Sequence, residues 1–331
     1  MNRFSPKNTC IALTLILITI GLARSSAQGP PTQYYTASQR LHVAGVGSVT
    51  WSPDESMLAV TIWPNIQIWD AESWQLIVEI EEVYAGYISW HPDSAQIATV
   101  RGGVEENLLI WNAATGNLEI DLRRAPPPNA QGIITIYQLV WNPNGETIAT
   151  QSGFDTFLIW DWDTDLAPTT PVSPVVYHGL VDIEWHPDGK RIATGGTDYT
   201  LRIWDSETGE NLVTVPGYKN VEFNAAGTVL FGSGTDNGIH LWDSASGAEI
   251  TSFGAGSGAV SFLELSPDDR LIAMRRGRDN IEIWDVTSEK RVQIFDLTLY
   301  AEYLDWNPSG EQIASVTDDN ITIWELHHPE S

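Results

Sequence analysis

The sequence predicts an all-β fold: a seven-bladed β-propeller of four-stranded antiparallel blades, closed by its N-terminal strand. One unit, which opens with a Trp-x-Pro-like turn and closes with an Ile-Trp-Asp-like strand, recurs seven times. The closing tryptophans follow one another at roughly the 40–45-residue period of four-stranded blades. The last unit ends at Glu325 and lacks a fourth strand, whereas residues Thr32–Val43 precede the first unit and are left over. We therefore expect Thr32–Val43 to pair with the seventh blade and close the ring.

Each unit reads as four strands. In the first strand an apolar residue stands two positions before the opening residue, and a period of two indicates a strand with one buried face. These apolar residues are Val49, Ile88, Leu139, Ile183, Val221, Leu263 and Leu304. Turn residues and a second apolar run follow. The third strands end at Trp69, Trp111, Trp160, Trp204, Trp242, Trp284 and Trp324. Fourth strands are expected at Trp74–Ile80, Asn117–Leu122, Asn211–Val215, Glu249–Phe253 and Arg291–Phe295.

With these motifs, the chain from about Tyr34 to Leu326 resembles the WD-repeat family. The resemblance implies a non-catalytic scaffold that presents its rim loops and top face to proteins or peptides. A typical repeat pairs a His before the first strand with an Asp in the turn before the Trp strand. Asp198, Asp236, Asp279 and Asp318 match this Asp, but no His stands at the matching distance in their units. His42 has the right spacing, but its unit carries Asn65 near the turn. We expect the polar network of the family to be incomplete here.

The N-terminus reads as an export signal, so the expected organisation is a signal peptide over 1–27 and a single propeller over 28–331. Arg3 and Lys7 precede the uncharged run Cys10–Leu22, which is short for a membrane span. Ser25-Ser26-Ala27 is a suitable cleavage site. An uncleaved membrane anchor is the alternative. We expect a periplasmic or extracellular monomer that does not span the membrane once the signal is removed. Cys10 is the only cysteine, so the mature chain would have no disulfide.

The charge balance and the absence of catalytic motifs limit the classes of function that the sequence allows. The chain holds 43 Asp and Glu against 17 Lys and Arg, and phosphate contact needs a basic surface, so a general nucleic-acid partner is excluded. No nucleophile-elbow, zinc-protease or phosphate-loop motif occurs in the sequence. We therefore expect no enzyme activity and no cofactor. His91 and His186 stand at the middle of Trp-x-Pro and read as turn residues.

Two sets of residues are candidates for partner contact. Tyrosines stand just before first strands, where they would reach the channel mouth as interface anchors, or pack half-buried. A cluster of arginines lies between the second and third strands of the sixth unit, where it could bind a carboxylate or neutralise acidic neighbours within the fold. The candidates are Tyr87, Tyr137, Tyr218, Tyr303, Arg275, Arg276 and Arg278.

A further candidate is a series of acids just before the opening residue. Strand side chains alternate, so these residues face away from the opening residue and toward the central channel. The seven units place Thr50, Ser89, Val140, Glu184, Glu222, Glu264 and Asp305 there. Glu184, Glu222, Glu264 and Asp305 would form an acidic arc over four consecutive blades. The arc is a weak candidate for binding Ca²⁺ or a partner's Lys or Arg. Otherwise water hydrates it, or Arg275, Arg276 or Arg278 reaches it.

Two proline-rich insertions, Arg123–Gly132 and Asp165–Pro174, read as surface loops that could touch a partner. The first reading is thus an exported scaffold that binds a protein or peptide on its top face and channel mouth. One alternative is a propeller enzyme, of the metal-assisted hydrolase or lactonase type, that uses the channel carboxylates. A second alternative is a carbohydrate or surface-polymer binder that uses Trp63, Trp74 or Trp162.

Overall fold

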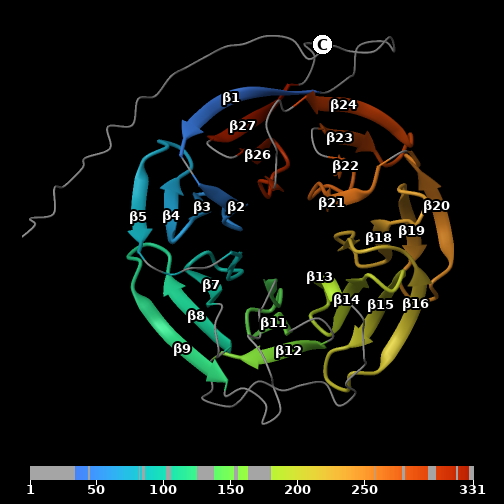
Figure 1. The fold of residues 1–331 in the computed structure, drawn as a ribbon, viewed down its shortest axis with the longest axis horizontal. Helices are drawn as coiled ribbons and strands as arrows, with labels where there is room; N and C mark the ends of the chain where they lie inside the picture. Colours follow the sequence, from blue (N-terminus) through green and yellow to red (C-terminus); the bar gives the residue numbers. More distant parts are fainter. Residues whose placement is uncertain are drawn as a thin grey trace, which may run out of the picture.

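The strands form a closed ring of seven antiparallel sheets around a central axis (Figure 1). The computed structural model describes residues 34–43, 45–81, 83, 86–101, 106–124, 138–152, 156–162, 180–256, 258–277, 280–296, 303–317 and 320–327. The predicted seven-bladed, all-β fold is confirmed. Blades 1 to 7 are numbered here by their inner strands in chain order. Six sheets have four strands, and blade 3 has three within the described residues.

Each blade is built outward from the channel. The inner strands are β2 (Val46–Trp51), β6 (Ile88–Trp90), β10 (Leu139–Trp141), β13 (Leu180–Trp185), β17 (Val221–Phe223), β21 (Val260–Leu265) and β25 (Leu304–Trp306). The second strands are β3 (Met57–Ile62), β7 (Gln96–Arg101), β11 (Thr147–Ser152), β14 (Arg191–Gly196), β18 (Val229–Ser233), β22 (Leu271–Arg276) and β26 (Gln312–Thr317). The third strands are β4 (Asn65–Asp70), β8 (Glu106–Asn112), β12 (Thr156–Asp161), β15 (Thr200–Asp205), β19 (Ile239–Asp243), β23 (Asn280–Asp285) and β27 (Asn320–His327). The outer strands are β5 (Leu76–Ile80), β9 (Leu118–Arg124), β16 (Asn211–Pro216), β20 (Glu249–Phe253), β24 (Lys290–Asp296) and β1 (Tyr34–His42).

The ring closes through its N-terminal strand, as predicted. Strand β1 pairs antiparallel with β27 from Tyr34 opposite His327 to His42 opposite Asn320, and Figure 1 shows the two strands side by side. The side chains of Tyr35 and Leu41 are buried. The Tyr35 backbone N–H donates to Gln293 Oε1 on β24, at 2.8 Å, which ties the closing strand to blade 6 as well. Closure joins the first and last repeats and removes an open sheet edge.

The closing tryptophans pack at the centre of the blades, and four of them share one polar contact. Each tryptophan pairs with a residue of the second strand. Its indole N–H donates to the side-chain hydroxyl that stands two positions further along that strand. The donor–acceptor pairs are Trp111 to Thr99, Trp160 to Thr150, Trp204 to Thr194 and Trp324 to Ser315, at 2.8–2.9 Å. In blade 1 the equivalent residue is Val60, and the buried Trp69 Nε1 has no hydrogen-bond partner. In blade 6 the equivalent residue is Met274, and the Trp284 indole donates to the Glu282 carboxylate instead, at 2.9 Å.

Several sequence-based boundaries shift in the structure. The fourth strands lie at the predicted places with ends displaced by a few residues. The insertion predicted to begin at Arg123 begins later, because β9 runs through Arg124, which pairs with Glu106. The remainder of that insertion, the insertion Asp165–Pro174 and the signal segment 1–27 lie outside the described residues.

Candidate functional site: channel and top face

The inner strands carry two layers of side chains toward the channel. Their chain direction defines a top face, where inner strands begin near Tyr87 and Tyr303, and a bottom face, where they end at the Trp-x-Pro turns. Residues two apart on a strand share a face. The lower layer is the predicted set of Thr50, Ser89, Val140, Glu184, Glu222, Glu264 and Asp305. One step nearer the top lie Ser48, Tyr87, Gln138, Asp182, Asn220, Phe262 and Tyr303.

The acidic arc forms, and its members lie close enough to interact. The four residues are half-buried as a whole, and desolvation acts on each carboxyl group. Desolvation raises the pKa of Glu184 to about 8 and that of Asp305 to about 6. Burial and the neighbouring acids also raise the pKa values of Glu222 and Glu264 well above the ordinary range. A closely spaced set of acids in a low-dielectric site binds protons that separate carboxylates would release.

Carboxylates of the arc also cap the exposed edges of neighbouring inner strands. Asp305 Oδ2 on blade 7 accepts the backbone N–H of Trp51 on blade 1 at 2.7 Å. Glu264 Oε1 on blade 6 accepts that of Trp306 on blade 7 at 3.0 Å. In the same way, the Ser89 hydroxyl on blade 2 accepts the backbone N–H of Trp141 on blade 3. An inner strand has no partner on its channel side, so these contacts satisfy backbone donors that the sheet leaves unpaired.

Asp182, in the upper layer, joins three blades. Its carboxylate accepts the Gln138 side-chain amide of blade 3 at 2.8 Å and the Val221 backbone N–H of blade 5 at 2.9 Å. It also accepts the N–H of Ile183 in its own strand. Desolvation nevertheless raises the pKa of Asp182. The sequence pattern did not single out this residue, although it lies two positions before Glu184 on the same strand.

Two of the predicted tyrosines close part of the channel mouth. Tyr87 and Tyr303 pack edge to face, with ring centroids 6.2 Å apart, and the Tyr303 hydroxyl donates to that of Tyr87 at 3.4 Å. They belong to blades 2 and 7, so the pair meets in front of blade 1. Both side chains are half-buried. Tyr137 lies outside the described residues.

The fourth tyrosine, Tyr218, belongs to a stack on the top face between blades 4 and 5. Its ring lies parallel to that of Tyr199, with centroids 5.2 Å apart, and Lys219 Nζ lies 4.8 Å from the Tyr218 centroid. Tyr199 is 58% exposed and has a φ of 64°. Sequence reasoning missed Tyr199. The available signal was its place in the turn TDYT, where the next blade has TDNG, with Asn237 at the same left-handed position.

The predicted arginines make contacts within the fold. Arg276 donates to the carbonyl oxygens of Asn237 and Gly254 on blade 5, and Arg275 Nε donates to Ser261 Oγ at 2.8 Å. The Arg276 guanidinium also lies 3.8 Å from the carboxylate of Glu282. Glu282 is an acidic neighbour of the kind that the alternative names, whereas the other contacts are with backbone carbonyls and a serine hydroxyl. Arg278 lies outside the described residues.

The family's Asp positions use partners from their own strand. The Asp198 carboxylate lies 2.8 Å from the guanidinium of Arg202, four residues further along the chain. At the same spacing, the Asp236 carboxylate lies 2.9 Å from the imidazole of His240. His42 lies 3.3 Å from Asn320 instead. The expected departure from the family network is therefore present in these blades, with a basic residue of the third strand in place of the His. Asp279 and Asp318 lie outside the described residues.

The three exposed-tryptophan candidates differ. Trp63 is 68% exposed in the turn between β3 and β4 on the top face. Trp74 packs edge to face on Trp51, with centroids 6.0 Å apart. Trp162 donates its indole N–H to the Gly145 carbonyl at 2.7 Å and packs on Trp141. Two of the three side chains that the carbohydrate reading would use are thus packed in the fold.

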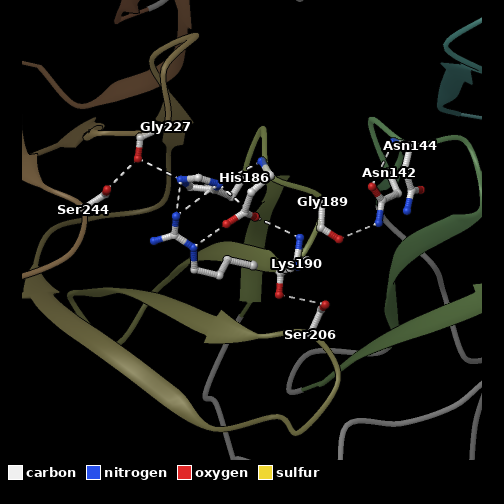
Figure 2. Close-up of polar contacts among 10 residues, drawn as sticks. Asn142, Asn144, His186, Gly189, Lys190, Ser206, Gly227 and Ser244 are labelled. Atoms are coloured by element: carbon white, nitrogen blue, oxygen red, sulfur yellow. Dashed lines mark hydrogen bonds and ion pairs between the residues drawn. The ribbon is translucent and has the colours of Figure 1, made fainter.

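The Trp-x-Pro turns on the bottom face are linked from blade to blade. The buried His186 ring lies 2.8 Å from the Gly227 carbonyl of blade 5, and Arg191 and Asp188 surround it (Figure 2). Asn142 donates to the Gly189 carbonyl at 2.9 Å in the preceding interface. His91 makes the equivalent contact with the Gly145 carbonyl at 3.2 Å. His91 and His186 are turn residues as predicted, and they also connect consecutive blades.

Two features are absent from the described residues. No group of three or more His, Cys, Asp or Glu side chains there is arranged to hold a metal ion. No helix in the same part of the chain is long and apolar enough to cross a membrane.

Comparison with known proteins identifies the repeat. The family model described as WD domain, G-beta repeat matches residues 171–205, which contain β13, β14 and β15. No curated protein matches the chain. Six further antiparallel sheets of three or four described strands complete the ring with the matched unit, and β1 supplies the outer strand of blade 7. The chain is therefore a seven-bladed β-propeller, and one of its units, residues 171–205, matches the WD-repeat family model.

Proposed function

We propose that this propeller is an exported scaffold, not an enzyme, that binds a protein or peptide through its top face. The observation that carries the proposal is Tyr199, which is 58% exposed and held at a φ of 64°. A non-glycine residue in the left-handed region costs about 1 kcal/mol or more, and such strain often accompanies function. A fold that needed only a turn here would favour Asn or Gly.

The surroundings of Tyr199 fix its ring for recognition. Tyr218 covers one face of it. The Tyr199 carbonyl accepts a hydrogen bond from the Gly217 backbone N–H at 3.1 Å. The Tyr218 backbone N–H donates to the Ser233 carbonyl at 2.7 Å. A rigid aromatic group gives a large contact area with little loss of side-chain entropy on binding. Trp63, on the same face of blade 1, offers a second exposed aromatic group.

The test is affinity capture from the native exported fraction, with the full mature chain as bait. Tyr199→Asn is the test variant, because Asn suits the turn and keeps the fold. Leu118→Ser is the matched control, because Leu118 is 46% exposed on the outer strand β9, away from the top face. We expect Tyr199→Asn to lose the captured partner and Leu118→Ser to keep it. Equal capture by both variants, or metal-dependent hydrolysis by the purified protein, would overturn the proposal.

A further inference from the structure

The inner wall of blades 4 to 7 concentrates acids and holds no basic residue at the facing positions. Strand β13 contributes Asp182 and Glu184, β17 contributes Glu222, β21 contributes Glu264 and β25 contributes Asp305. The remaining inner strands present uncharged residues in the lower layer, namely Thr50, Ser89 and Val140. A charge lost or gained at one acid therefore acts directly on the others.

Two of these acids on neighbouring blades are bonded to each other. The side chains of Glu264 and Asp305 share a hydrogen bond. A carboxylate only accepts, so a hydrogen bond between two carboxyls needs a proton on one of them. Glu264 also accepts the Trp306 N–H at 3.0 Å, and Asp305 accepts the Trp51 N–H at 2.7 Å. A continuous chain of hydrogen bonds thus crosses blades 6, 7 and 1.

This series of hydrogen bonds lies at the junction where the ring of blades closes. Blade 7 is the one blade assembled from both ends of the sequence, with β1 paired to β27. Only non-covalent contacts hold that pairing. Along the inner wall, Glu264 and Asp305 connect this blade to its two neighbours.

We propose that the Glu264–Asp305 pair is a pH-sensitive clasp on the ring closure. While the carboxyls share a proton, the clasp holds blades 6, 7 and 1 together at the inner wall. When the proton leaves, two carboxylates face each other across the blade 6–blade 7 interface, and their repulsion loosens it. Tyr303 stands two residues before Asp305, immediately ahead of β25, so the loosening reaches the Tyr87–Tyr303 contact at the channel mouth. The clasp does not depend on the proposed partner.

The direction of the effect follows from proton binding. Burial raises the pKa of Asp305 to about 6 and that of Glu264 well above its ordinary range. Between the ordinary and the raised pKa values, the folded chain binds more protons than the unfolded chain. The free energy of unfolding therefore falls as the pH rises through this window. The clasp stabilises the fold at acid pH and weakens at alkaline pH.

The test is hydrogen–deuterium exchange of the full mature chain at about pH 5.5 and about pH 8.5, corrected for the intrinsic pH dependence of exchange. We expect protection at β25, β27 and β1 to fall at the higher pH while protection of the core strands of blade 2, which contributes no acid to the arc, changes little. The melting temperature should fall over the same range. Glu264→Gln supplies a permanent amide donor to Asp305 and keeps an oxygen for the Trp306 N–H. This variant should retain the protection of blade 7 at the higher pH.

Glu207→Gln is the matched control, because it removes the same charge from an exposed bottom-face turn. It should behave as the unmodified protein does. Uniform loss of protection around the ring, or a melting temperature that rises with pH, would overturn the clasp. So would a Glu207→Gln variant that protects blade 7 as well as Glu264→Gln does. If Glu264→Gln does not fold, the exchange pattern of the unmodified chain still decides the question.

Discussion

The hydroxyl of Tyr303 on blade 7 lies 3.4 Å from the hydroxyl of Tyr87 on blade 2, in front of the inner strand of blade 1. The bond is long, whereas the edge-to-face ring contact is well formed, with centroids 6.2 Å apart. We expect Tyr303→Phe to change the free energy of unfolding by less than about 1 kcal/mol. Tyr303→Ala should cost more, because the ring packing is lost as well. Chemical denaturation of both variants measures the difference, and equal losses would contradict the importance of packing.

The N-terminal strand should be required for the closed ring. Deleting Thr32–Val43 removes the partner of β27 and exposes surface that Tyr35 and Leu41 now cover. Full burial of one large apolar side chain contributes about 1.5–3 kcal/mol, so the deletion should destabilise the fold by at least about 3 kcal/mol. A chain that begins at Gln33 keeps the whole strand and serves as the control. Identical melting curves for the two truncations would exclude closure by this strand.

Blade 1 should accept a stabilising substitution. Val60 occupies the position where four other blades offer a hydroxyl to the closing tryptophan, and Trp69 Nε1 is buried without a hydrogen-bond partner. Val60→Thr should raise the free energy of unfolding by up to about 1 kcal/mol. Val316→Thr, in the same apolar cluster, buries a hydroxyl in blade 7, where the Trp324 indole already donates to Ser315, and should cost about 1–3 kcal/mol. Denaturant melts that rank the two variants the other way would refute the pairing rule.

The closing tryptophans should act through stability. Trp204 is buried, donates to Thr194 Oγ1 at 2.8 Å and packs against Phe157 of blade 3. Trp204→Ala should leave a cavity between blades 3 and 4 and cost about 3–5 kcal/mol. Thermal denaturation measures the loss. A variant with altered partner binding and unaltered stability would instead place Trp204 in the binding site.

Sequence periodicity predicted the ring, its closing strand and the inward arc, because these follow from alternation along strands and a fixed repeat length. Periodicity could not predict the hydrogen bond from the Trp51 backbone N–H to the Asp305 carboxylate, since that contact joins residues 254 positions apart. The pairing of Tyr87 with Tyr303 likewise arises only when the ring closes. Arg276 was a partner candidate because of its charge, yet the carbonyls it binds belong to loops of the neighbouring blade. Tyr199 was missed because its significance lies in its left-handed backbone conformation, which in the sequence is indicated only by comparing its turn TDYT with TDNG of the next blade.

The measurement that tests the binding face most directly is hydrogen–deuterium exchange of the mature chain with and without its captured partner. We expect new protection at the turn that contains Tyr199 and at the segment from Gly217 to Asn220, with little change at the outer strands β5, β9, β16 and β20. Protection confined to those outer strands or to the bottom turns around His91 and His186 would contradict binding through the top face.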